Sequence, residues 1–369
     1  MTRTIAITRR PHQVRPGPAP ALLTEGQLAP ILTKLIPTWE SFKVSKAIHA
    51  LRLWGPDATF GDPKSASPFH TRVFTGRELL GLFLDHRQYL RSVHATSPIL
   101  EDSDDGVIVR YKSASRRLEG DLAHVDKLLR VCGELDIPSD FRIRTPGRET
   151  TLREVVRGAV ANFDASKELE WSVEAFARYF EDAKSWTNRF GETFGFDEAV
   201  QALAGRGVGK SPCFGTHLPY ALTMLYRLDD SVPRLGRASK ETIRALLRGF
   251  SDDLERSQRD DGSWPMTWSG GVVLSPEVRR NEDPAVDLTL RLTVLGHHLE
   301  WIGFAPEDLR PGLASIRRAV DFALESFHRV PLSIVEDQYH ALTHLGKALC
   351  TFAGVRHTES DRLLRDTTL

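Results

Sequence analysis

Apolar residues recur at intervals of three or four along most of the chain, and clusters of Gly, Pro, Asp and Ser separate these stretches. This spacing places apolar side chains on one face of a helix. It predicts helices over residues 39–54, 75–92, 115–135, 149–163, 167–182, 195–204, 213–228, 239–257, 284–303, 308–328 and 335–353. Strand-like patterns are sparse, and the best of them lie at residues 106–111 and 140–145. We therefore expect an all-α protein with a few short strands at most.

The helices predicted in the C-terminal half alternate between two types. Residues 239–257 and 308–328 are amphipathic with a broad charged face, which is typical of helices in an outer layer. Residues 213–228, 284–303 and 335–353 carry few charges and several histidines, which indicates inner helices shielded from water. This alternation is the order that stacked helical hairpins require.

The segment "QRDDGSW", residues 258–264, directly follows one of the predicted outer helices. Gln258 can bond to backbone groups left free at a helix end, and Gly262 permits unusual turn dihedrals. The segment resembles the QW motif of squalene–hopene and oxidosqualene cyclases, which also recurs in loosened form in protein prenyltransferase β-subunits. In that family the motif caps an outer helix. We therefore expect Gln258 at the C-terminal end of an outer helix and Trp264 mostly buried.

The chain also resembles bacterial proteins with prenyltransferase/squalene-cyclase-like repeats, and this resemblance implies an α/α toroid of stacked helical hairpins. It is most secure over residues 204–355, and residues 25–203 form either the rest of the same ring or an associated helical domain. We expect a disordered N-terminal segment over residues 1–24, the toroid over residues 25–355, and a tail over residues 356–369.

Charge and composition restrict the class of partner. The 369 residues include 49 Lys and Arg and 49 Asp and Glu, so the net charge is zero, which argues against nucleic acid or an anionic membrane as partner. The sequence has no signal-peptide pattern and no run of 18 apolar residues. Its three cysteines do not suggest a disulfide framework. We expect a cytoplasmic protein that binds a small molecule, without membrane insertion.

Cys213 and His217 are the first candidates for chemistry. If a helix begins at Pro212, Cys213 lies in its first turn, where the helix dipole lowers the pKa of a thiol, and His217 shares its face. If Pro219 marks the helix start instead, residues 213–217 form a turn. Three interpretations stay open: half of a metal site, a nucleophile with its base, or a buried thiol beside a hydrogen-bonded imidazole.

Further histidines lie on the predicted inner helices. His340 and His344 are four residues apart, and the spacing favours His298 over His297 on the face of Asp287. We predict that one cavity is lined by Cys213, His217 and at least one of His297, His298, His340 and His344. The candidate metal is zinc, and its candidate ligands are Cys213, His217, His340 and His344.

The family resemblance also implies zinc, because protein prenyltransferases bind it with a D-x-C pair and a distant Tyr-His. In this chain "DQYH" resembles the family's D-x-Y-H-T segment at Asp337, Tyr339 and His340. Ser211 stands where the D-x-C pair would have its Asp, and one extra hairpin separates Cys213 from His340. Protein prenyltransferase activity is therefore not expected.

The catalytic candidates are Cys213, His217, His298, Asp287 and Tyr339. We expect an enzyme that binds a small, partly apolar substrate, such as an isoprenoid, in the central cavity of the toroid beside the Cys/His site. One alternative is a metal-free catalyst, which would resemble either a polysaccharide lyase or a cyclase; "NRFG" and "THLPYAL" together offer the Asn, Arg, His and Tyr of the lyases, whereas no cyclase D-x-D-D motif occurs. The other alternative is a toroid that binds or acts as a scaffold without catalysis.

Overall fold

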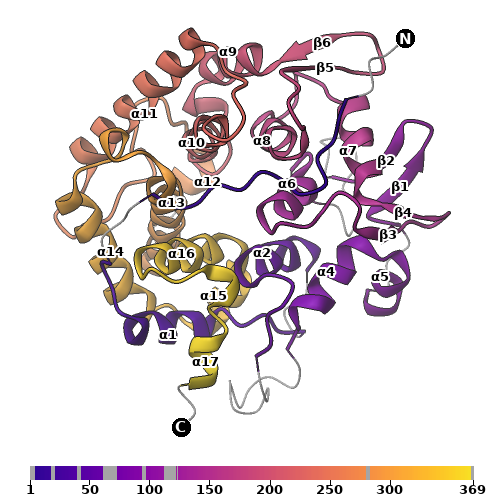
Figure 1. Cartoon of the computed structure of the whole chain (residues 1–369). Helices are drawn as coiled ribbons and strands as arrows, with labels where there is room; N and C mark the ends of the chain where they lie inside the picture. Colours follow the sequence, from indigo (N-terminus) through magenta and orange to yellow (C-terminus); the bar gives the residue numbers. More distant parts are fainter. Residues whose placement is uncertain are drawn as a thin grey trace.

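The computed structural model describes residues 5–17, 21–39, 43–60, 73–93, 97–111, 122, 124–279 and 283–366. These residues are mostly helical, so the all-α prediction is confirmed. The strands within them form three separate antiparallel pairs (Figure 1). The pairs are β1 (Leu100–Ser103) with β2 (Gly106–Val109), β3 (Arg142–Arg144) with β4 (Glu149–Thr151), and β5 (Ser185–Thr187) with β6 (Thr193–Gly195).

Six helices of the described part form an inner layer around the centre of the molecule (Figure 1). They are α2 (Val44–Trp54), α6 (Lys127–Glu134), α8 (Glu170–Tyr179), α10 (His217–Asp229), α13 (Pro284–Phe304) and α16 (Tyr339–Phe352). Each contacts the next in this order and α16 contacts α2, so the contacts close into a ring. Residues 25–203 and 204–355 each contribute three of these helices.

A second set of helices lies outside the ring and alternates with the inner helices along the chain. These outer helices are α1 (Glu25–Lys34), α4 (Gly76–Leu84), α7 (Leu152–Ala161), α9 (Phe196–Arg206), α11 (Arg237–Ser257) and α14 (Leu313–Phe327). The shorter helices are α5 (His86–Ser92), α12 (Pro276–Arg279), α15 (Leu332–Asp337) and α17 (Arg362–Asp366). The alternating order is that of stacked hairpins, whereas kinship with the cyclase toroids stays a prediction.

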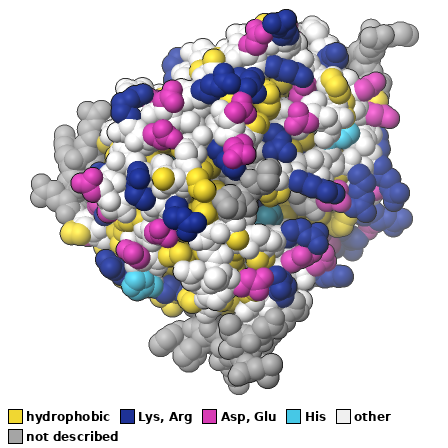
Figure 2. All heavy atoms as spheres, turned by 60° about the vertical axis from the view of Figure 1, so that its left-hand side comes forward, with side chains coloured by type: hydrophobic (Ala, Val, Ile, Leu, Met, Phe, Trp, Pro, Cys, Tyr) yellow, Lys and Arg dark blue, Asp and Glu magenta, His cyan; other side chains and the backbone are white. Residues whose placement is uncertain are grey.

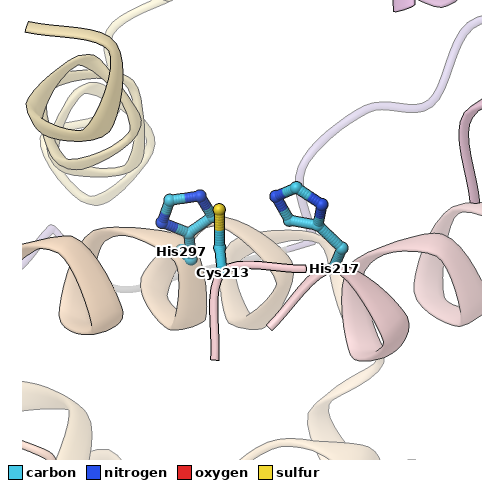
Figure 3. A group of neighbouring side chains, drawn as sticks. All are labelled: Cys213, His217 and His297. Carbon is cyan, nitrogen blue, oxygen red and sulfur yellow. The ribbon is translucent and has the colours of Figure 1, made fainter. Parts of the chain in front are cut away.

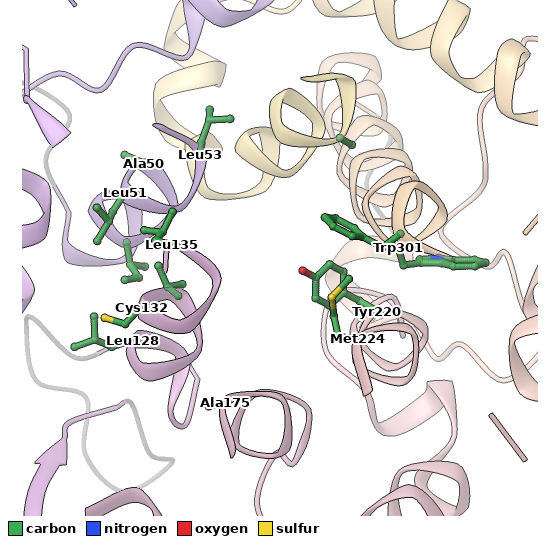
Figure 4. Packing of buried hydrophobic residues seen from close by; sticks show 14 of the residues in the cluster. Ala50, Leu51, Leu53, Leu128, Cys132, Leu135, Ala175, Tyr220, Met224 and Trp301 are labelled. Carbon is green, nitrogen blue, oxygen red and sulfur yellow. The ribbon is translucent and has the colours of Figure 1, made fainter. Parts of the chain in front are cut away.

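Apolar side chains pack between the two layers, and polar side chains point toward the centre. Leu51 of α2 and Leu128 and Cys132 of α6 point away from the centre and are fully buried, whereas Tyr220 of α10 points toward it (Figure 4). The close contact of α13 with α16 depends on Gly296, since a Cβ there would lie 2.7 Å from the backbone nitrogen of Leu345.

The "QRDDGSW" segment closes the end of α11. Gln258 is the C-cap residue, and its side-chain amide donates to the carbonyls of Gly262 and Ser315, both at 2.9 Å. Trp264 is completely buried and donates from its indole nitrogen to the carbonyl of Leu254 at 3.1 Å. The expected positions of Gln258 and Trp264 are therefore observed, and the relation of this segment to the cyclase family stays a prediction.

The beginning of the chain is held against the ring. Residues 5–17 cross the C-terminal ends of inner helices as an extended strap (Figure 1, dark indigo). The amides of Thr8, His12 and Gly17 donate to the carbonyls of Tyr179, Arg178 and Gly303 at 2.9, 2.8 and 3.0 Å. These carbonyls belong to helix ends and lack partners within their helices. The prediction of disorder over residues 1–24 is therefore wrong for this strap, because the helix ends fix its backbone.

The C-terminal tail is also packed as far as residue 366. His357 contacts the carbonyl of Leu53 through Nδ1 at 3.0 Å, and Asp361 accepts a hydrogen bond from the amide of Thr59 at 2.9 Å. Helix α17 contacts α1, so the described part of the tail belongs to the outer layer.

Charges of both signs are interspersed over the surface. The face in Figure 2 shows Lys and Arg side chains beside Asp and Glu side chains, in agreement with the zero net charge. In the described residues, no helix is both long enough and apolar enough to cross a lipid bilayer.

Candidate metal centre

Imidazole rings from different inner helices form a continuous chain of contacts around the ring centre. His217 of α10 lies 5.3 Å from His124 and 5.4 Å from His297 of α13, measured between ring centroids. His297 stacks on His344 of α16 at 3.8 Å, and His344 lies 5.3 Å from His49 of α2. The ring centre therefore gathers the residue type that most often binds metal ions in proteins.

Cys213, His217 and His297 form the tightest group in this layer. Each offers one potential ligand atom, and these atoms all lie within 4.8 Å of one another. Figure 3 shows the three side chains pointing toward one region from the turn before α10, from α10 and from α13. The predicted grouping of Cys213 and His217 with an inner-helix histidine is observed. The ligand atoms of a zinc ion lie about 3–4 Å apart, so metal binding would draw this group together by about 1 Å.

Cys213 is held by a left-handed turn and does not lie in a helix. Its φ is 49°, Phe214 and Gly215 follow with φ of 61° and 80°, and α10 begins only at His217. Of the two local structures considered for residues 213–217, the turn is therefore correct. Left-handed dihedrals at residues with side chains cost about 1–3 kcal/mol each and concentrate at functional sites. The indole of Trp268 donates to the carbonyl of Phe214 at 2.8 Å and helps to hold the turn.

The thiol of Cys213 is protonated at neutral pH in the metal-free site. Burial of the thiol raises its pKa to about 11, and the nearby cation of Lys127 only partly opposes this effect. The lowered pKa expected from a helix dipole is therefore wrong, because α10 begins only after Cys213 and the thiol does not lie in its first turn. A metal ion would displace this proton, since only the thiolate binds metal.

The imidazoles of His217 and His297 are neutral and have free nitrogen atoms. Burial lowers the pKa of His297 to about 3 and that of His217 well below its usual value. Nδ1 of His297 lies 2.8 Å from the carbonyl of Thr293, to which it donates in the corresponding tautomer, so that Nε2 keeps a lone pair. Within the described residues, neither His297 Nε2 nor His217 Nδ1 has a hydrogen-bond partner, although both are buried. This donor set fits a divalent metal ion that prefers nitrogen and sulfur ligands, such as zinc.

A buried network of ion pairs adjoins the imidazoles. Arg52 contacts Glu134 at 2.8 Å and Glu300 at 2.7 Å, and both carboxylates also contact Lys347. The central cavity, which lies between this network and the imidazoles, has about 10 Å³ of free space, enough for about one water molecule. Its lining consists of Arg52, Arg130, Glu170, Trp171, Glu174, Thr216, His217, Tyr220, Ala221, His297, Glu300 and His344. The centre of the ring is therefore charged and closely packed.

Lys127 is a functional candidate that sequence reasoning missed. It is buried at the start of α6, and its Nζ lies 2.7 Å from Nε2 of His49. Burial, together with the positive charge of Arg52, lowers its pKa to about 7. A signal was present, because Lys127 and Arg130 interrupt the apolar stretch of a helix that the pattern predicted.

The other metal candidates lie close to this group but outside it. His344 stacks on His297, but its Nδ1 faces Glu300 at 2.5 Å. His340 is exposed, and its ring lies 5.8 Å from that of His49. The structure thus places His297 beside Cys213 and His217, where the sequence suggested His340 and His344.

The other catalytic candidates have structural partners elsewhere. His298 accepts a hydrogen bond from the indole of Trp301 at 3.0 Å and lies against Trp268 on the side of α13 away from the cavity. Asp287 pairs with Arg291 at 2.8 Å, and its side chain is 39% exposed. The hydroxyl of Tyr339 donates to the carbonyl of Leu35 at 2.7 Å.

Comparison of the chain with protein-family models, with curated proteins and with solved structures gives no match. The candidate metal centre consequently rests on its own geometry, and membership of the cyclase-like family stays a prediction.

Proposed function

We propose that this chain is a zinc-dependent enzyme that acts on a small molecule at the centre of the helical ring. The observation that carries this proposal is the convergence of Cys213, His217 and His297, whose potential ligand atoms lie within 4.8 Å of one another. Three protein ligands leave one position of a tetrahedral zinc ion for water or substrate, which is the arrangement of catalytic zinc sites. His217 and His297 also line the central cavity, so the free position would face it.

Zinc at this position would polarise a carbonyl group or lower the pKa of a bound water to near 7. The chain supplies a group for proton transfer beside it. Lys127 has a pKa of about 7 and therefore exchanges a proton readily near neutral pH. Nδ1 of His49 lies 2.6 Å from the carbonyl of Ser45, which favours the tautomer whose Nε2 accepts from Lys127.

The lining of the cavity favours a polar substrate over an isoprenoid. Arg52, Arg130, Glu174 and Glu300 all line the small central space, and each is buried. An apolar chain placed there would exclude water from these charges and offer them no further hydrogen bonds, which is costly. We therefore propose a small polar substrate in place of the partly apolar one expected from the family resemblance.

Two alternatives have less support. In a metal-free enzyme, Cys213 would serve as a nucleophile, but a thiol with a pKa of about 11 is almost entirely protonated near neutral pH. For a lyase, Asn188 would have to reach the centre, but it lies in the β5–β6 hairpin and donates to the carbonyl of Phe163 at 3.1 Å.

Metal analysis of the purified protein tests the proposal. We expect stoichiometric zinc that survives dialysis in the wild type and is lost in Cys213→Ser. The control is Cys132→Ala: Cys132 is also buried, but it lies on the side of α6 that faces away from the centre, so this variant should retain zinc. Wild-type protein that neither contains zinc nor takes it up would overturn the proposal.

A further inference from the structure

Arg130 occupies a rigid position at the ring centre. It lies on α6, is completely buried and lines the central cavity. Its guanidinium carbon lies 4.5 Å from the ring centroid of Trp171 and 4.6 Å from that of Tyr220. Contact with two aromatic rings fixes the plane of the guanidinium group and stabilises its charge.

The hydrogen bonds of Arg130 are incomplete. Its Nε donates to Glu174 at 2.6 Å. Its second terminal nitrogen lies 3.6 Å from a carboxylate oxygen of Glu134, which is too long for a hydrogen bond. Within the described residues, neither terminal nitrogen of Arg130 has a hydrogen-bond partner. Buried charged donors without partners are rare and costly, so these nitrogens need a hydrogen-bond acceptor that the described residues do not supply.

The other cations of this buried network have partners. Ion pairs link Arg52, Arg130, Arg178 and Lys347 with Glu134, Glu174 and Glu300. Burial and the positive charge of Arg52 lower the pKa of Lys347 well below its usual value. Arg52 and Arg178 already donate to carboxylates and to other acceptors through their terminal nitrogens. Arg130 is therefore where an additional anion would bind.

The same cavity joins Arg130 to the candidate metal centre. Arg130, His217 and His297 all line it. Trp171 bridges the two sites, because its ring contacts Arg130 and lies 4.8 Å from the ring of His217. A small molecule bound through an anionic group at Arg130 would therefore lie beside the metal ligands.

We propose that Arg130 binds the anionic group of the substrate and that this group is a carboxylate. A carboxylate is planar and accepts two parallel hydrogen bonds from the terminal nitrogens of a guanidinium group. The free space of about 10 Å³ holds about one water molecule, so a carboxylate, which is smaller than a tetrahedral phosphate, would require less rearrangement of the lining. That the molecule is a substrate rests on the proposed zinc enzyme, whereas binding of a carboxylate at Arg130 does not.

Formate is a suitable probe because it is the smallest carboxylate, and formamide is its uncharged counterpart. Calorimetric titration of the metal-free protein should show binding of formate and not of formamide at constant ionic strength. Arg130→Lys keeps the charge and loses the planar pair of donors, so we expect formate affinity to fall by at least about tenfold. Arg178→Lys is the matched control, since Arg178 also pairs with Glu174 but has bonded nitrogens, and its formate affinity should change little.

The outcomes separate this inference from the proposed function. Formate binding that depends on Arg130 supports the anion site even if the protein binds no zinc. No formate binding to the wild type, equal binding of formamide, or equal effects of the two substitutions would overturn the anion site while leaving the zinc proposal intact. The formate and formamide comparison uses the wild type alone and therefore stands even if Arg130→Lys does not fold.

Discussion

Two neighbouring residues, His297 and His298, have opposite environments in the same helix. His297 faces the ring centre, and its unpaired Nε2 is a potential ligand atom of the candidate metal group. His298 faces the tryptophans of the "QRDDGSW" region and lies 4.5 Å from the ring centroid of Trp268. Both side chains are buried, but their partners differ. Comparing the two residues therefore distinguishes a role in metal binding from a role in packing.

Replacement of each histidine in turn tests this separation. We expect His297→Gln to lose most of its zinc while keeping nearly wild-type stability in the metal-free state, because the site is polar. His298→Gln should retain zinc and lose about 1–3 kcal/mol of stability, because the buried indole of Trp301 loses its acceptor. Zinc content and urea unfolding of both variants are the measurements. Equal zinc in both variants would contradict the ligand assignment.

At the residue scale, the sequence identified part of the site. The spacing of Cys213 and His217 and their position before an inner helix were sufficient to select them. The sequence could not show which of His297 and His298 faces the centre. Both lie on a helix that is buried on nearly all sides, so no exposed face indicates how the helix is rotated. Arg130 was missed because its aromatic contacts come from α8 and α10, which are distant in the sequence.

At the element scale, glycines determine how closely the helices approach. On α13, Gly296 allows the backbone of α16 to approach within a distance that a side chain would block. On α11, Gly249 faces open space, where nothing lies within 4 Å of the position of a Cβ. Glycine therefore has a packing role at position 296 and none at position 249.

Alanine at these two positions should change stability in opposite directions. Gly296→Ala should destabilise the protein by about 1–3 kcal/mol, because α13 and α16 must move apart. Gly249→Ala should stabilise it by about 0.5–1 kcal/mol through helix propensity. Urea unfolding measures both effects. A stabilising Gly296→Ala would show that α13 and α16 do not pack as closely as described.

The elements themselves were largely predictable from hydrophobic periodicity. The outer helix α11 (Arg237–Ser257) matches the prediction over residues 239–257 within two residues at its start. The main differences have one local and one tertiary cause. Residues 75–92 divide into α4 and α5 because Asp85 caps the second helix with its side chain. The strap over residues 5–17 has no periodicity, and its order comes from helix-end carbonyls elsewhere in the chain.

At the scale of the whole molecule, the fold buries many histidines in their neutral form. Burial lowers the pKa of His49, His217, His297, His298, His344 and His357 below the usual value. In the unfolded chain these groups take up protons below a pH of about 6.5, whereas in the folded protein they stay neutral to lower pH. Acid therefore favours the unfolded state.

The metal-free protein should consequently lose stability steeply on mild acidification. Each histidine contributes up to about 1.4 kcal/mol per pH unit below pH 6.5, and several act together. We expect the free energy of unfolding to fall by several kcal/mol between pH 7 and about pH 5.5. Urea unfolding in the presence of a chelator measures this dependence. A flat profile would mean that the ring centre is open to water.

X-ray absorption of the zinc-loaded protein tests the central claim most directly, because it reports the ligand atoms themselves. The account predicts one sulfur at about 2.3 Å and nitrogen or oxygen ligands at about 2.0–2.1 Å in the wild type, and no sulfur ligand to any zinc that Cys213→Ser binds in excess zinc. Zinc surrounded only by oxygen and nitrogen in the wild type, or a sulfur signal that persists in Cys213→Ser, would contradict a metal centre formed by Cys213, His217 and His297.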